Sequence, residues 1–318
     1  EYMVAHGYPY VMGIPTDAMR VAVPHADLEN FYGRLLPEAL RGVHPSLVFN
    51  MDEMGAERYA DAKHVKVFVP EEHDRGEGMA IGVPRSSRRV TLMVCIVLDG
   101  SHLTPAIVIK NVTVNSLLFE RGYDSDNVVL YTTKNSFVTG DVFGKWLCDV
   151  FIPYVEAKRE ALRQRLGTFD ERAVLILDGC SSHKKEEHRL LLESKNITML
   201  FLVPHSSHLT QPLDLVIFGR VKNLIRDQDT YAVSLEELDE ALDDVRDDLE
   251  ETRRPRAERG KVLAEYIAAI LDSFERASTR RLVVSAFRQA GILYDTPDPH
   301  NHRRVTYVDP SEARAVVA

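Results

Sequence analysis

The stretch Ala173-Val174-Leu175-Ile176-Leu177-Asp178 contains five consecutive apolar residues followed by an acid. A second apolar run extends from Ile197 to Val203, and a polar, charged segment of helix length, Lys184 to Lys195, separates the two runs. Short continuous apolar runs of this kind are typical of strands that are buried on both faces. The stretch therefore predicts a strand-helix-strand unit.

Earlier apolar runs predict further strands in the same sheet. These runs are rich in β-branched residues and are broken by Gly, Pro or charged clusters. They extend over Leu47 to Met51, Val65 to Val69, Val90 to Leu98 and Ala106 to Ile109. Asp99-Gly100 is a turn signal between the last two. Several neighbouring strands are therefore expected before the central unit.

Helical patterns flank these strands. Apolar residues recur at helical spacing in residues 26–36, where Pro37 interrupts the pattern, in residues 141–166, where Pro153 predicts a kink, and in residues 215–225. Strands before and between helices favour a mixed α/β sheet flanked by helices.

The acidic charge is concentrated in one segment. The formal net charge is −9, but residues 229–251 contain eleven acids and one base, a net of −10, which leaves the remainder near +1. Apolar spacing in this segment predicts an amphipathic helix with an acidic outer face, and a second helical pattern extends from Val262 to Phe274. We expect a helical lead-in over residues 1–45, a core over residues 46–228 and a C-terminal helical appendage over residues 229–318.

Composition excludes several classes of protein. The longest apolar run, Val90 to Leu98, is far shorter than the roughly 20 residues that cross a membrane, so no membrane partner is expected. The three cysteines, Cys95, Cys148 and Cys180, are odd in number and widely spaced, which favours a reducing intracellular compartment over a disulfide framework. No secretory signal is present at the start, and the missing initiator Met indicates a fragment or a processed chain.

Three acids follow apolar segments and suggest a metal site. Asp52 closes the run Leu47 to Met51, Asp178 closes the central strand, and Asp214 follows Gln211-Pro212-Leu213. Carboxylate oxygens are hard ligands suited to Mg²⁺ or Mn²⁺. An Asp after a strand is also a common helix cap or turn former, so each acid taken alone favours a structural role.

The neighbouring residues resemble those of a known family. Asn50-Met51-Asp52-Glu53-Met54-Gly55 resembles the motif around the first catalytic acid of pogo-like transposases of the mariner superfamily, within the DDE superfamily endonucleases. Leu177-Asp178-Gly179-Cys180-Ser181-Ser182-His183 resembles the second motif, and the segment from Leu202 to Asp214 is similar to the third. The similarity covers residues 46–228, and Thr279 to Ile292 is similar to the element that closes such domains.

This resemblance implies a ribonuclease-H-like fold in which Asp52, Asp178 and Asp214 hold two Mg²⁺ or Mn²⁺ ions. The implied activity is DNA strand cleavage, followed by attack of the freed 3′-hydroxyl on target DNA in the nucleus. A homodimer is compatible with the resemblance. Such proteins normally carry helix-turn-helix domains ahead of the core, and residues 1–45 hold no basic cluster. Recognition of specific DNA ends is therefore expected from a region outside this chain.

Two other functions remain open. The family includes domesticated proteins related to centromere protein B and jerky-type proteins, so a catalytically silent DNA-binding or interaction protein is the alternative. A nuclease unrelated to transposition would share the same site.

Other candidate residues have weaker support. Arg85, Arg88, Arg89 and His183 are candidate DNA contacts, although a solvated surface explains the arginines equally well. Turn hydrogen bonding is favoured for His205 and His208. Cys180 with His183 could suggest a thiol nucleophile, but a lone cysteine is usually inert. Glu53 could assist a metal or form a surface pair.

Overall fold

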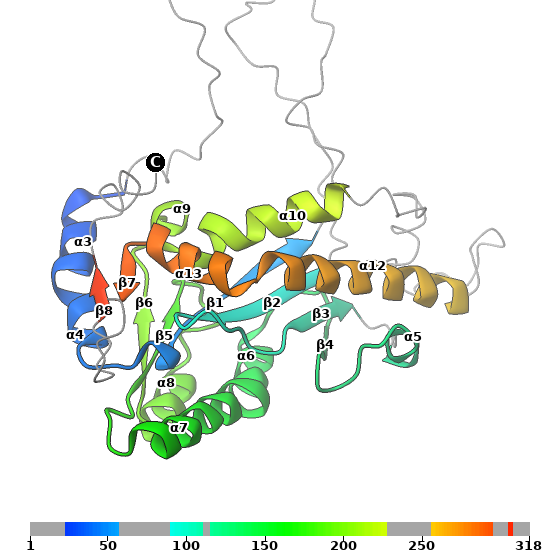
Figure 1. Cartoon of the computed structure of the whole chain (residues 1–318). Coiled ribbons are helices and arrows are strands. Elements are labelled where there is room, and N and C mark those ends of the chain that lie inside the picture. Colours follow the sequence, from blue (N-terminus) through cyan, green and yellow to red (C-terminus); the bar gives the residue numbers. More distant parts are fainter. Residues whose placement is uncertain (1–22, 57–89, 111–114, 228–255, 295–304, 308–318) are drawn as a thin grey trace, which may run out of the picture.

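The computed structural model describes residues 23–56, 90–110, 115–227, 256–294 and 305–307 (Figure 1). Three sets of sequence predictions lie outside these ranges. They are the strand Val65 to Val69, the three arginines Arg85, Arg88 and Arg89, and the acidic helix over residues 229–251.

The main sheet has six strands in the order β4-β3-β2-β1-β5-β6. Strand β1 pairs antiparallel with β2 and parallel with β5, β2 pairs antiparallel with β3, and β3–β4 and β5–β6 are parallel. The bounds are Val48–Ala56 for β1, Val90–Val97 for β2, Ala106–Lys110 for β3, Val129–Thr133 for β4, Ala173–Leu177 for β5 and Ile197–Phe201 for β6. This is the ribonuclease-H-like mixed sheet that the sequence predicted.

Burial along the strands follows their place in the sheet. Every residue of β2 and of β5 is buried, because both strands lie inside the sheet and have helices over them. The prediction that the strand beginning at Ile197 is fully buried was wrong, since Thr198 is exposed. Strand β6 ends the sheet and is covered less completely.

Helices cover the sheet on both sides. In Figure 1, α6, α7 and α8 lie below the sheet and α10, α12 and α13 lie above it. The bounds are His25–Asn30 for α3, Leu36–Leu40 for α4, Asn115–Glu120 for α5, Gly140–Trp146 for α6, Ile152–Leu166 for α7, Glu186–Ser194 for α8, Ser207–Thr210 for α9, Phe218–Asp227 for α10, Arg256–Ala277 for α12 and Arg280–Gln289 for α13. A separate two-stranded sheet joins β7, Ile292–Tyr294, to β8, Val305–Tyr307.

The C-terminal helices share the core of the sheet. Ile267 and Phe274 of α12 and Phe287 of α13 are fully buried and belong to the same hydrophobic cluster as Phe49 of β1. We find no helix with the length and apolar character of a membrane span among the residues that the structure describes.

Two helical segments contain a proline next to a widened turn. The interruption predicted at Pro37 is not formed, because a π-helical turn over Phe31–Leu35 leads into α4, which includes Pro37. The predicted irregularity near Pro153 has the same form, a π-helical turn over Leu147–Phe151 that precedes α7. Each proline stands at the start of the helix that follows, where its missing N–H costs little.

The turn after β2 is held by an ion pair. Asp99-Gly100 forms the predicted turn, and Gly100 has a φ of +94°, where a side chain would collide with Arg280. Asp99 Oδ1 accepts a hydrogen bond from the Ser101 backbone N–H at 2.9 Å, and Lys158 Nζ of α7 lies 3.0 Å from Asp99 Oδ2. The turn is therefore fastened to the helix that packs below the sheet.

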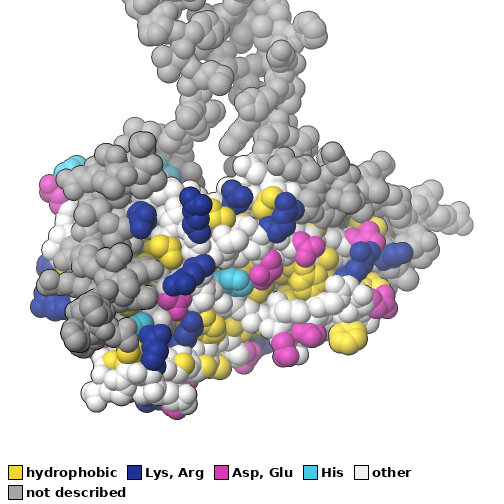
Figure 2. Space-filling model, in the orientation of Figure 1, with side chains coloured by type: hydrophobic (Ala, Val, Ile, Leu, Met, Phe, Trp, Pro, Cys, Tyr) yellow, Lys and Arg dark blue, Asp and Glu magenta, His cyan; other side chains and the backbone are white. Residues whose placement is uncertain are grey.

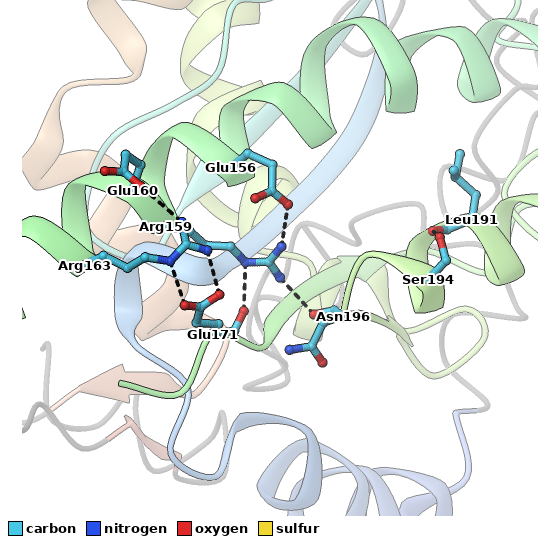
Figure 3. Close-up of polar contacts among 8 residues, drawn as sticks. All are labelled: Glu156, Arg159, Glu160, Arg163, Glu171, Leu191, Ser194 and Asn196. Carbon is cyan, nitrogen blue, oxygen red and sulfur yellow. Dashed lines mark hydrogen bonds and ion pairs between the residues drawn. The ribbon is translucent and has the colours of Figure 1, made fainter. Parts of the chain in front are cut away.

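The starts of β5 and β6 are fastened to α7 by Arg159 (Figure 3). Its side chain is only 4% exposed, and its guanidinium donates to the Glu171 carbonyl at 2.8 Å, to the Asn196 carbonyl at 3.0 Å and to Glu156 Oε1 at 2.7 Å. Arg163, one helical turn later, pairs with the Glu171 carboxylate at the surface. Arg159 therefore fixes the N-terminal ends of β5 and β6, and Asp178 follows the opposite, C-terminal end of β5.

Candidate active site

Asp52 and Asp178 lie at the same level of two neighbouring parallel strands. The pairs Val48 with Val174 and Asn50 with Ile176 set the register of β1 against β5. Continued by two residues, this register aligns Asp52 with Asp178. In-register residues of parallel strands point to the same face of a sheet, so these two carboxylates share a face.

The expectation that Asp52 ends its strand was wrong. Strand β1 continues to Ala56, and Asp52 pairs with Val94 of β2. Met54 and Ala56 are buried and extend the apolar alternation beyond the acid. Glu53, expected beyond the strand end, also lies within β1. Of the two strands, only β5 ends at its acid, since Asp178 follows Leu177 and β1 continues past Asp52.

His183 connects two of the acidic residues. Its Nδ1 lies 2.9 Å from Asp178 Oδ1, its Nε2 lies 3.0 Å from Glu53 Oε1, and its side chain has no exposed surface. Burial lowers the pKa of His183, but the contacts with the Asp178 and Glu53 carboxylates and their charges outweigh burial and raise the pKa to about 10. A protonated imidazole therefore stands between the two carboxylates at neutral pH.

Asp178 is held in its charged form. Its Oδ1 also accepts the backbone N–H of Cys180 at 3.1 Å. Burial raises the pKa of the Asp178 carboxyl, but the interactions with His183 and Cys180 outweigh this effect and keep the pKa below its usual range. The turn after β5 thus supplies a carboxylate that is both ionised and oriented.

The pKa of Asp52 is shifted in the direction opposite to that of Asp178. Its side chain is buried, and burial raises the pKa of its carboxyl well above the usual range, while the negative charges of Asp214, Glu53 and Asp178 raise it further. Interaction with the Gln211 side chain lowers the pKa in part. The charges that act on Asp52 come from three segments that are distant in the sequence, so the fold brings acids from all three segments into one region.

Asp214 lies where the sequence placed it, in the first turn after Pro212. The chain forms a π-helical turn over Leu213–Ile217 and continues into α10. Asp214 is exposed, unlike Asp52.

Two polar residues at this site were quoted in the motifs, but no role was predicted for them. Asn50 and Gln211 are both fully buried, and Asn50 Nδ2 donates to Gln211 Oε1 at 2.7 Å. The sequence signal was present, because Asn50 interrupts the apolar run from Leu47 to Met51, and a buried amide requires partners.

The donor chemistry fits a hard divalent cation, since the gathered side chains are carboxylates that repel one another. Within the described ranges, no three His, Cys, Asp or Glu side chains come together as the ligands of a single ion. The structure therefore shows clustered acids, and the closer approach needed for shared ligation is not formed in it.

The structure also places the histidines and the cysteine that were candidates in the sequence. His183 has no exposed side chain through which it could contact DNA in this structure. Both of its ring nitrogens face carboxylates, so neither serves as a base for Cys180, whose sulfur instead accepts from Ser182 Oγ at 3.2 Å. His208 lies in α9, and His205 has a φ of +62° in the turn before it.

The charge on one face of the molecule is mixed. Figure 2 shows Lys and Arg side chains spread among Asp and Glu side chains over the helices above the sheet. Arg280, Arg281 and Arg288 of α13 are exposed.

The strand order and the mixed pairing of the six strands are those of a ribonuclease-H-like fold. The family model described as DDE superfamily endonuclease matches residues 87–276, and the chain belongs to this family. Asp178 and Asp214 lie inside the matched residues, and Asp52 precedes them. The family resemblance predicted from the motifs is thereby confirmed.

Two curated relatives match the chain over part of their length. A protein from Cochliobolus lunatus named MFS-type transporter clz9 is 28% identical over 224 residues, which are 70% of this chain and 21% of that protein. Tigger transposable element-derived protein 7 from Homo sapiens is 27% identical over 143 residues, 44% of this chain and 25% of that protein. The matched parts span about a quarter or less of these relatives.

Solved structures of Mos1 transposase have low overall similarity. The catalytic domain of Mos1 mariner transposase has a TM-score of 0.40 at 14% identity, covering 84% of this chain and 98% of that chain. The Mos1 Strand Transfer Complex has a TM-score of 0.44 at 14% identity, covering 91% of this chain and 64% of that chain.

Proposed function

We propose that the chain is the catalytic core of a metal-dependent DNA endonuclease and strand transferase. Asp52, Asp178 and Asp214 would hold two Mg²⁺ or Mn²⁺ ions. The supporting observation is the electrostatic state of Asp52, a carboxyl whose pKa is raised first by burial and further by the negative charges of Asp214, Glu53 and Asp178. Clustered acids with this repulsion are stabilised by a cation, and the fold retains them although they cost stability.

The surrounding residues prepare the acids for this role. When bound, two such ions would activate the attacking oxygen and stabilise the leaving oxygen of a phosphodiester. His183 orients Asp178 and Glu53 through its two ring nitrogens. The same protonated ring offsets part of the negative charge in the absence of metal. The hydrogen bond from Glu53 N–H to Asp52 Oδ1, at 2.8 Å, fixes one oxygen of the buried acid.

The direct test is cleavage of DNA. Purified protein with Mn²⁺ should nick short duplex DNA, and Asp178→Ala should abolish nicking while its circular dichroism spectrum remains that of the wild type. Asp149→Asn, which changes an exposed acid of the π-helical turn below the sheet, is the matched control and should cleave normally. Cleavage that survives in Asp178→Ala would contradict the proposed mechanism.

The alternative is a domesticated protein that keeps this fold without turnover. The absence of a preformed three-ligand group among the described residues favours this alternative. Titration with Mn²⁺ separates the two, because a silent scaffold has no need to bind metal at these acids. Wild-type protein that binds no Mn²⁺ and cleaves no DNA would support the alternative.

The proposed chemistry determines the partners. DNA would be the substrate, and the nucleus is the proposed compartment. Selection of DNA ends would come from a region outside this chain, and a homodimer would place two such cores on paired ends.

A further inference from the structure

Asn50 makes three hydrogen bonds from the centre of the sheet. Its backbone lies between Ile96 of β2 and Ile176 of β5, and its side chain is fully buried. Nδ2 donates to the Ile176 carbonyl at 3.1 Å and to Gln211 Oε1 at 2.7 Å. Oδ1 accepts the backbone N–H of Leu213 at 3.2 Å. Both amide hydrogens and one acceptor position are therefore in use.

The partners of Asn50 lie next to the three acids in the sequence. Asn50 precedes Asp52 by two residues and shares its face of β1. Ile176 likewise precedes Asp178 by two residues, and Leu213 directly precedes Asp214. One neutral side chain thus connects the three segments that carry the acids.

We infer that Asn50 is a positioning residue that fixes the three acid-bearing segments relative to one another. This inference rests on the proposed metal-dependent function. Like charges in a low-dielectric site push their backbone segments apart, and a charged cross-link would either add to the repulsion or neutralise an acid. A neutral amide holds the segments without either effect. Supporting residues of this kind typically change metal affinity when they are replaced.

The test compares Asn50→Leu with Thr91→Val. Leucine preserves the bulk of Asn50 and removes all three hydrogen bonds. Thr91 is a buried residue of β2 whose hydroxyl donates to the Ser136 carbonyl at 2.6 Å, so its valine variant loses a buried hydrogen bond that touches none of the acid-bearing segments. Amide hydrogen exchange in metal-free protein and Mn²⁺ titration are measured for both variants.

We expect Asn50→Leu to lose exchange protection in residues 207–217 and to bind Mn²⁺ about 10- to 100-fold more weakly. Thr91→Val should retain both properties, even if its melting temperature falls. Wild-type protection of residues 207–217 in Asn50→Leu would overturn the inference. Wild-type Mn²⁺ affinity in that variant would overturn it as well, because the acids would then be positioned without Asn50.

A milder variant keeps the test decisive if Asn50→Leu does not fold. Gln211→Met removes one of the three bonds and leaves Asn50 in place, and we expect a smaller loss of protection and affinity in the same direction. Unchanged values would overturn the inference. Wild-type protein that binds no Mn²⁺ would count against the proposed function alone, since the exchange measurement requires no metal and still decides whether Asn50 ties the segments.

Discussion

Asp52 is a residue whose charge opposes folding. It is buried in β1, and the negative charges of Asp214, Glu53 and Asp178 surround it. A buried acid with a raised pKa destabilises the folded protein increasingly as the pH rises above the ordinary Asp pKa, and fully above the raised pKa, because the charged form is disfavoured only in the folded state. Buried acids of this kind are typical of functional sites, where they are kept although they lower the stability of the folded protein.

We predict that Asp52→Asn melts at a higher temperature than the wild type in metal-free buffer at pH 7. Asparagine still accepts the Glu53 N–H and removes the buried charge. Each kcal/mol of relieved repulsion raises the melting temperature by about 2–4 °C. Thermal melts in EDTA measure the effect, and Asp149→Asn serves as the exposed control. A lower melting temperature for Asp52→Asn would show that the acid stabilises the fold.

The positions of Asp178 and Asp214 in the fold could be predicted from the sequence, but the contacts around them could not. Asp178 directly follows a recognisable apolar strand, and Asp214 follows a proline that begins a helix. Their catalytic roles remain a proposal. The contacts of His183 with Glu53 and of Asn50 with Gln211 join residues more than a hundred positions apart. Such contacts depend on the register of β1 against β5, which apolar spacing within one strand does not specify.

At the scale of elements, α7 fixes the starts of β5 and β6 through Arg159. We predict that Arg159→Met lowers the free energy of unfolding by about 2–4 kcal/mol, because two backbone carbonyls lose a charged, buried donor. Arg163→Met removes a surface ion pair from the same helix and should have a much smaller effect. Urea unfolding measures both. An equal loss of unfolding free energy in the two variants would mean that the contacts of Arg159 with the two carbonyls add little to stability.

The turn between β2 and β3 gives a pH-dependent prediction. Burial raises the pKa of Asp99, but hydrogen bonds from Ser101 and Lys158 outweigh it and hold the pKa below its usual range. A lowered folded-state pKa contributes stability that is present above the ordinary Asp range and is lost as the pH falls through the folded pKa. Asp99→Asn should therefore be less stable than the wild type at pH 7, and the difference should shrink below about pH 4. A difference that stays constant from pH 7 to pH 3 would rule out this ion pair as its source.

Elements were easier to predict than their ends. The apolar runs for β1, β2, β3 and β5 were visible in the sequence, as was α8 between β5 and β6. The end of β1 was missed because Asp52 and Glu53 interrupt the apolar pattern while the pairing with β2 continues. Pro37 was misjudged for a related reason, since a π-helical turn before a proline leaves no signal in apolar spacing.

At the scale of the whole molecule, metal binding should be coupled to stability. We predict that saturating Mn²⁺ raises the melting temperature of the wild type by several degrees, because a ligand that binds only the folded state stabilises it by about 2.7 kcal/mol at a hundredfold excess over Kd. EDTA should reverse the shift, and Asp178→Asn should abolish it. Differential scanning fluorimetry measures all three conditions. An equal shift in Asp178→Asn would place the bound metal elsewhere.

The register of β1 against β5 also limits how this chain can vary in length. Side chains along a strand alternate between faces, so one residue inserted between Asn50 and Asp52 would turn the acid away from Asp178 and toward the opposite layer of helices. Two inserted residues would restore the face but move the acid about 7 Å along the strand. Descendants of this gene that keep the site should therefore accept substitutions between these two positions, but not insertions or deletions.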